Sequence, residues 1–180
     1  MLLLINLKEI QIWNGKSMNI HYEKESDVNV ITKIHDLAFE GKDEGIIVNK
    51  LRESGNLTIS LVYESDECPV GHIAYSPISN QSQEIVGIGL APVGILPEFQ
   101  NQGIGSALIE EGNKMVQDLG YDLIFVLGDP QYYLRFGFEL ARDYNYFCDY
   151  DPIGNHFMVQ GCKNKKVART IVNYTSDFEL

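Results

Sequence analysis

Basic residues are scarce in this sequence. Its 180 residues include 14 Lys and Arg against 25 Asp and Glu, which gives a formal net charge of −11. General nucleic-acid binders and polybasic membrane binders both rely on positive charge, so this balance argues against both classes. We therefore expect neither a nucleic-acid partner nor a membrane partner.

Cysteine is also scarce and scattered. The three thiols, Cys68, Cys148 and Cys162, are odd in number, widely spaced and form no C-x-x-C pair. This pattern argues against a disulfide scaffold or a zinc site, and it predicts a protein of the reducing cytoplasm. The histidines show no metal-ligand grouping, so we expect no metal.

Long hydrophobic runs are missing as well. The apolar opening at residues 1–5 is too short for a signal peptide, and no stretch approaches the roughly 20 apolar residues of a membrane span. With 44% apolar residues, a chain of this length can bury about 70% of its unfolded surface, which suits one domain over 1–180. Residues 1–17 fit the pattern poorly, and we hypothesise that they are an N-terminal extension, with Met18 as the functional start.

Apolar periodicity predicts an α+β layer, in which helices pack against a mainly antiparallel sheet. Expected helices lie at 27–39 with Ser26 as N-cap, 43–53, 103–119 and 130–136. Expected strands lie at 19–23, 57–63, 70–75, 85–96, 123–127, 138–140, 145–149, 156–161 and 168–174. Glycine and proline interrupt strand 85–96, which indicates a bulge or an edge where another backbone or a ligand approaches.

The segment from Leu96 to Ser106 joins this interrupted strand to the strongest helix. Gly103 and Gly105 stand at the helix start, where unpaired backbone N–H groups and the helix macrodipole favour an anion. Such a pyrophosphate cradle needs no basic side chain, so it is compatible with an acidic chain. A dinucleotide fingerprint is excluded by Leu108, and the P-loop ending Gly-Lys-Ser/Thr is absent. A purely structural tight turn is the alternative.

Two motifs, which follow one another along the chain, resemble motifs of a known family. Gln100-x-x-Gly103-x-Gly105 resembles the acyl-CoA loop of the GNAT N-acetyltransferase superfamily, and the later segment Tyr133-Leu134-Arg135-Phe136-Gly137-Phe138 resembles its Tyr-x-x-x-Gly-Phe segment. The longer run from Leu127 to Phe138 is similar to a subgroup of small bacterial acetyltransferases. The resemblance covers the chain from about Asn19 to its C-terminal end.

This resemblance implies a fold and a co-substrate. The fold would be three-layered α/β/α, with a mixed sheet splayed open between its fourth and fifth strands and acetyl-CoA in the gap. Backbone groups of the fourth strand would bind the pantetheine arm, at Val93, Gly94 and Ile95. The matching pyrophosphate loop comprises Asn101, Gln102, Gly103, Ile104, Gly105 and Ser106.

The resemblance also implies an acyltransferase reaction, in which a small-molecule or protein amine attacks the thioester directly in a ternary complex. A backbone N–H near Ile95 would hold the oxyanion. Tyr133 matches the general acid for the CoA thiolate; the alternative is an aromatic that packs the short helix, a role for which Tyr132 has the stronger claim. By analogy with the superfamily, we expect a homodimer, and the acidic surface favours a cationic acceptor.

The general base departs from the family pattern. Many relatives carry a glutamate on strand four where this chain has Ala91. Glu84, His72 and Asp129 are substitutes, although a surface carboxylate, a packed histidine and a helix N-cap are their simpler interpretations. The missing glutamate keeps a second hypothesis open, a non-catalytic acyl-CoA-binding regulatory module. A third is an acyltransferase for longer acyl chains or hydroxyl acceptors.

Two further groups are weaker signals. The first is an aromatic cluster that either lines an acceptor pocket or packs the sheet, and it comprises Tyr144, Tyr146, Phe147 and Tyr150. The second is a basic group that we interpret as a solvated turn, and it comprises Lys163, Lys165, Lys166 and Arg169.

Overall fold

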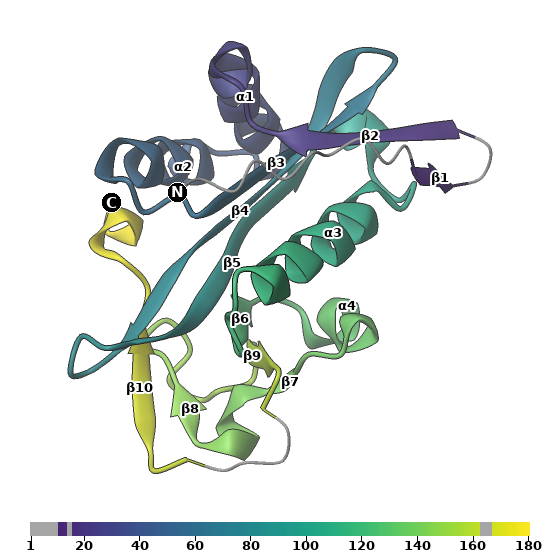
Figure 1. Ribbon diagram of the computed structural model, residues 1–180. Helices are drawn as coiled ribbons and strands as arrows, with labels where there is room; N and C mark the ends of the chain where they lie inside the picture. The colour runs from purple at the N-terminus through teal and green to yellow at the C-terminus, as the bar shows by residue number, and fades with distance from the viewer. Residues whose placement is uncertain (1–10, 14–15, 163–166) are drawn as a thin grey trace.

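The computed structural model describes residues 11–13, 16–162 and 167–180 (Figure 1). One sheet contains most of the strands, in the order β1-β2-β3-β4-β5-β6-β9-β7. Their bounds are β1 Gln11–Trp13, β2 Lys16–Tyr22, β3 Ile59–Ser65, β4 Cys68–Asn80, β5 Ile85–Ile95, β6 Ile124–Leu127, β7 Glu139–Leu140 and β9 Phe157–Gln160. The pairs along this order are antiparallel except β5–β6, which is parallel, so the expected mixed, mainly antiparallel sheet is confirmed.

Two short strands extend this arrangement near the C-terminus. Strand β10, Thr170–Asn173, pairs antiparallel with the end of β4 and parallel with β8, Tyr146–Phe147. The last residues then return toward the helix α2, Asp43–Ser54, and the side chain of Asn56, just after this helix, donates a hydrogen bond to Asp177 at 2.7 Å. The C-terminal turn Ser176–Phe178 therefore lies beside the second helix (Figure 1).

Helices cover both faces of the sheet (Figure 1). Helices α1, Val28–Ala38, and α2, Asp43–Ser54, pack on one face. Helix α3, Ile104–Asp118, packs on the other face, and the short α4, Pro130–Tyr133, follows β6. This arrangement confirms the three-layer α+β expectation. It leaves the carboxyl end of β5 between the two helical layers.

The sheet opens between β5 and β6. Their parallel pairing extends only from Ile88 to Leu90, whereas β5 continues to Ile95. On the other side of β5, the register with β4 shifts at Ala91 and Pro92. Proline has no N–H for the ladder, so this break follows from the sequence. The expected bulge is present. The expected splay between the fourth and fifth predicted strands is also present, because those strands, 85–96 and 123–127, correspond to β5 and β6. The splay frees backbone groups of β5 for another partner.

The start of the first helix differs from expectation. A 3₁₀ turn, Glu25–Asp27, precedes α1, and Asp27 is the residue at the N-cap position. Its carboxylate accepts the Lys24 N–H at 2.8 Å and so closes the turn. The prediction of Ser26 as N-cap was therefore wrong, because the aspartate next to it holds the turn that sets the helix start.

The first long strand is also longer than expected, since β2 begins at Lys16 and pairs with β1. Pairing between β2 and β3 starts at Asn19, and the described strand residues before it, 11–13 and 16–18, pair with one another. Whether residues 1–17 are dispensable stays a prediction.

Three residues of the basic group, Lys163, Lys165 and Lys166, lie outside the described residues. Among the residues that the structure does describe, no helix is long and apolar enough to cross a membrane.

Candidate functional site

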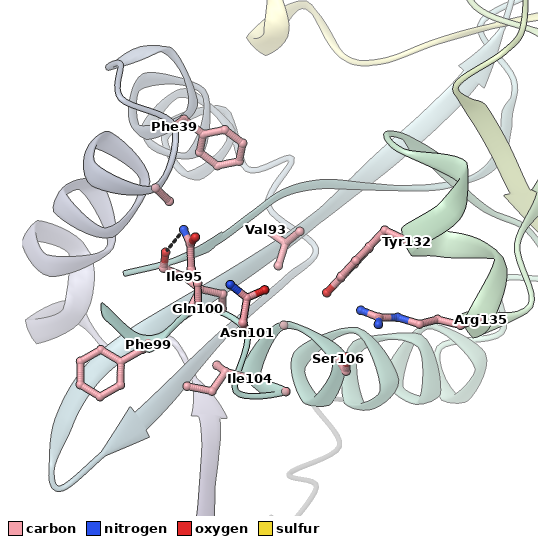
Figure 2. A pocket seen from close by; sticks show the side chains of 13 residues that line it. Phe39, Val93, Ile95, Phe99, Gln100, Asn101, Ile104, Ser106, Tyr132 and Arg135 are labelled. Atoms are coloured by element: carbon pink, nitrogen blue, oxygen red, sulfur yellow. Dashed lines mark hydrogen bonds between the residues drawn. The ribbon is translucent and has the colours of Figure 1, made fainter. Parts of the chain in front are cut away.

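The loop after β5 turns sharply into α3. The Gln100 side chain donates a hydrogen bond to the carbonyl oxygen of Ile95 at 3.1 Å, which fastens the loop to the end of β5 (Figure 2). Asn101 and Gly103 have φ of 58° and 86°, and this left-handed geometry is why position 103 favours glycine. Helix α3 begins at Ile104. The N–H groups of its first turn have no intrahelical partners, and no side chain caps them.

A cavity of about 460 Å³ opens over this helix start (Figure 2). Seven of the nine predicted co-substrate residues line it: Val93, Ile95, Asn101, Gly103, Ile104, Gly105 and Ser106. The Gln102 side chain instead folds back and donates to the Glu98 carbonyl at 3.0 Å. A Cβ at Gly105 would lie 2.8 Å from the Tyr132 hydroxyl, so glycine lets this aromatic approach the loop.

Arg135 supplies positive charge to the same cavity. Of the described residues that line it, Arg135 is the only basic one. Its guanidinium carbon lies 4.1 Å from the centre of the Tyr132 ring, a cation–π contact that orients the side chain. Sequence reasoning missed this residue, although it belongs to the Tyr-x-x-x-Gly-Phe segment. A helix start with free N–H groups and one arginine suits an anion on an otherwise acidic protein.

A second cavity, also of about 460 Å³, adjoins the first where β5 and β6 diverge. The two cavities share Phe39, Val93 and Tyr132 in their linings. The second is walled mainly by aliphatic and aromatic side chains, and it also contains two carboxylates, Glu44 and Asp129. A cavity that suits an anion therefore adjoins an apolar one.

Tyr133 lines the second cavity and is only 8% exposed. Its ring packs edge-to-face on Phe138, with centroids 5.7 Å apart, and Gly128 lies so close to it that no Cβ would fit there. Burial, and secondarily Tyr132, raise the pKa of Tyr133 well above its ordinary value. The phenol is therefore protonated at neutral pH. Contrary to expectation, Tyr133 is more buried than Tyr132, which lies between the two cavities.

The proposed substitutes for the general base separate in space. Glu84 lies in the turn between β4 and β5, where it accepts from the Asn80 amide at 2.9 Å, and it lines neither cavity. Asp129 lines the second cavity, and its carboxylate accepts the Gln131 N–H at 2.9 Å, so its N-cap role is confirmed. Glu44 on α2 was missed, because an acidic residue in the first turn of a helix is unremarkable in sequence.

His72 is fully buried and belongs to a chain of polar side chains behind β5. Its Nδ1 lies 2.7 Å from His35 Nε2, and its Nε2 lies 2.8 Å from the Ser60 hydroxyl, which in turn donates to the Glu23 carboxylate. Because that hydroxyl donates its only proton to Glu23, His72 Nε2 must donate to Ser60 and His35 Nε2 must donate to His72. The lone pair on His35 Nδ1 is left without a hydrogen-bond partner.

This polar chain ends against Gly94. A Cβ at position 94 would lie 2.7 Å from His35 Nδ1, so Gly94 faces α1 rather than the cavity. Burial lowers the pKa of His35 to about 4. Burial also lowers the pKa of His72 well below its ordinary value, and the nearby His35 and Arg52 lower it further. Both rings are therefore neutral at pH 7 and serve as packed hydrogen-bonding groups.

The four aromatic residues that the sequence grouped as a cluster have different surroundings in the structure. Tyr150 lines the second cavity, whereas Tyr146 packs on Phe125 with ring centroids 5.2 Å apart. Phe147 lies under the Arg169 guanidinium at 4.8 Å, and the Tyr144 hydroxyl donates to Glu139. Packing thus accounts for three of the four aromatics. Among the described residues, no group of three or more His, Cys, Asp and Glu is arranged to hold a metal ion.

Comparisons with known proteins agree with this geometry. The family model for the acetyltransferase (GNAT) domain matches residues 56–140. The chain is 37% identical over 123 residues to the uncharacterised N-acetyltransferase YhbS of Escherichia coli K12, covering 68% of this chain and 74% of that protein. It is 32% identical over 136 residues to the uncharacterised N-acetyltransferase YjhQ of the same strain, covering 72% and 75%.

Solved structures give the same result. The crystal structure of YhbS from Escherichia coli in complex with CoA superposes with a TM-score of 0.83 and 30% identity, covering 91% of this chain and 92% of that one. A GNAT family acetyltransferase from Brucella melitensis, crystallised with acetyl-CoA, gives a TM-score of 0.76 and 33% identity, with coverage of 90% and 98%.

Proposed function

This chain belongs to the GNAT family of acetyltransferases, and from that premise we propose that it transfers the acetyl group of acetyl-CoA to an amine by direct attack in a ternary complex. One observation carries the proposal. A cavity at the start of α3, lined by helix N–H groups and Arg135, adjoins an apolar cavity that contains Tyr133, at the point where β5 and β6 diverge. The complexes of YhbS with CoA and of the Brucella enzyme with acetyl-CoA support the choice of donor.

The first cavity would hold the phosphates and the pantetheine arm. Unpaired N–H groups from Ile104 to Ser106 suit the pyrophosphate, and Arg135 suits a phosphate at the cavity rim. Glycine at position 105 lets the Tyr132 hydroxyl approach the start of α3, beside these N–H groups. Backbone groups from Val93 to Ile95 would pair with the arm, as another strand would.

Tyr133 would stabilise the departing CoA thiolate. With ordinary values, moving a proton from a phenol of pKa about 10 to a thiolate of thiol pKa about 8.5 costs about 2 kcal/mol. Burial raises the pKa of Tyr133 further, which makes complete transfer more costly. The phenol would therefore act by donating a hydrogen bond to the developing thiolate, while a backbone N–H near Ile95 supports the oxyanion.

The amine must lose a proton before or during attack. At pH 7, deprotonating an alkyl ammonium of pKa about 10.4 costs about 4.6 kcal/mol. Glu44 and Asp129 are the carboxylates that line the second cavity, and we assign the base role to this pair acting through water. Glu84 is set aside because it lines neither cavity. A homodimer and a cytoplasmic location stay predictions.

Calorimetric titration with acetyl-CoA tests the donor, with CoA and NAD as controls. We expect saturable binding of acetyl-CoA and CoA and none of NAD. Absence of acetyl-CoA binding at hundreds of micromolar would leave the glycine turn with a structural role only.

Tyr133→Phe tests the chemistry, because it removes the hydroxyl and keeps the ring. We expect turnover, measured as amine-dependent CoA release, to fall about 10²-fold, with the Kd for acetyl-CoA nearly unchanged. Tyr144→Phe, a tyrosine that lines neither cavity, is the matched control and should retain turnover. If Tyr133→Phe turns over normally, Tyr133 has no acid role. Tight acetyl-CoA binding without transfer to any amine would favour the regulatory module instead.

A further inference from the structure

The walls of the second cavity indicate which amine the enzyme accepts, and this inference rests on the proposed acetyl transfer. Aromatic rings come from three separate parts of the chain: Phe39 after α1, Tyr132 on α4, and the C-terminal group Tyr150, Tyr174 and Phe178. Tyr174 packs on Phe178 with ring centroids 4.8 Å apart and on Tyr150 at 6.2 Å. These contacts pre-organise an aromatic wall before any ligand arrives.

The β5 side of this cavity is apolar. Leu90, Ala91, Pro92 and Val93 form it, and Ala91 is a small residue at the point where the sheet opens. A longer side chain at this position would project into the space next to Tyr133. The alanine leaves that space free and uncharged, so it can take an apolar body that is wider than an alkyl chain.

Charge in the cavity has one sign. Glu44 and Asp129 line it, and no Lys, Arg or His is found among the described residues that do so. An ammonium group thus finds carboxylates, and aromatic faces add cation–π attraction. A carboxylate on the acceptor would find no partner and would face two like charges, which disfavours its desolvation.

Tyr150 offers a further indication. Its side chain is 56% exposed at the rim of the cavity, and its only ring contact among the described aromatics is with Tyr174. A large aromatic that packs this little in the free protein gains contact when a flat ligand covers it. Ile153, three residues later, is even more exposed but does not line the cavity.

We propose that the acceptor is a primary amine attached to an aromatic or comparably flat apolar body and carrying no carboxylate. Such a molecule places its ring against Tyr150, Tyr174 and Phe178. Its ammonium then lies toward Glu44 and Asp129, close to Tyr133. The ammonium loses one proton to the carboxylate pair through water, and the neutral nitrogen forms the new C–N bond. As the C–S bond breaks, the nitrogen gives up its second proton to the thiolate, so that CoA departs as the thiol.

Three probe amines test the proposal with acetyl-CoA and the wild-type protein, by measuring CoA release. 2-Phenylethylamine and L-phenylalanine differ only in the carboxylate, and spermidine is a cation without a ring. We expect kcat/KM for 2-phenylethylamine to exceed that for phenylalanine about 100-fold and that for spermidine roughly 10-fold. Tyr150→Ala should raise the KM for 2-phenylethylamine about 10-fold, whereas Ile153→Ala, at an exposed residue outside the cavity, should leave it near wild type.

The contrary outcomes are distinct. If phenylalanine or spermidine is the better acceptor, acetyl transfer stands and this acceptor class is wrong. If hexanoyl-CoA is used much faster than acetyl-CoA, the aromatic cavity holds the acyl chain, and the acceptor proposal is again overturned. If acetyl-CoA binds but none of the three amines releases CoA, this acceptor class is wrong, whereas acetyl transfer itself fails only if a wide range of other amines also releases none.

Discussion

Lowering the pH from 7.5 to 5 should destabilise the protein through the buried pair His35 and His72. Each imidazole is neutral in the fold, whereas an unfolded histidine binds a proton below its pKa of about 6.5. Burial lowers the pKa of His35 from 6.5 to about 4. The stabilisation from keeping it neutral is therefore complete above pH 6.5 and is lost progressively as the pH falls toward 4.

The magnitude follows from this shift. A shift of about 2.5 pKa units at 1.36 kcal/mol per unit corresponds to about 3 kcal/mol in full, of which about 2 kcal/mol is lost at pH 5. His72, whose pKa is also lowered, adds to this loss. The lowered pKa values of Asp151 and Asp177 act in the same sense, but only as the pH falls below about 4, so they lie outside this window.

Urea denaturation followed by circular dichroism at pH 7.5, 6 and 5 measures the effect. His35→Leu removes one titrating group and should reduce the pH slope of unfolding free energy, even if the variant is less stable at every pH. Ile34→Val is the matched control, because it loosens the same buried helix face without removing a proton site. A wild-type stability that is flat from pH 7.5 to 5, or an unchanged slope in His35→Leu, would refute the reasoning.

Three other changes have defined outcomes. Gly94→Ala places a Cβ 2.7 Å from His35 Nδ1, so we expect a loss of about 1–3 kcal/mol in thermal or urea unfolding, and wild-type stability would mean that the ring moves freely. Arg135→Gln should weaken acetyl-CoA binding about 10-fold in calorimetry, because a charged phosphate contact is lost; an unchanged Kd would remove Arg135 from the site. A chain that begins at Met18 should retain circular dichroism and acetyl-CoA binding, since the pairing with β3 starts after that residue, and an unfolded product would contradict the extension hypothesis.

Local sequence patterns determined most of the fold and, within the site, the loop at the start of α3 and the segment around Tyr133. Alternating and helical apolar periods depend on neighbours within one element, so the strands and helices could be predicted apart from details such as the start of α1. Proline at position 92 and glycine at 103 act on the backbone where they stand, which is why the splay and the loop after it could also be predicted. The segment around Tyr133 is similarly contiguous.

Only the tertiary structure decided the composition of the second cavity and the buried chain behind β5. Glu44 and Tyr150 come from elements more than a hundred residues apart, and His35 and His72 are separated by 37 positions. Their meeting depends on how α1, α2 and the C-terminal segments pack on the two sides of β5. No period or spacing in the sequence encodes that packing, because side-chain contacts between distant elements are set by the burial of the whole core rather than by any single segment.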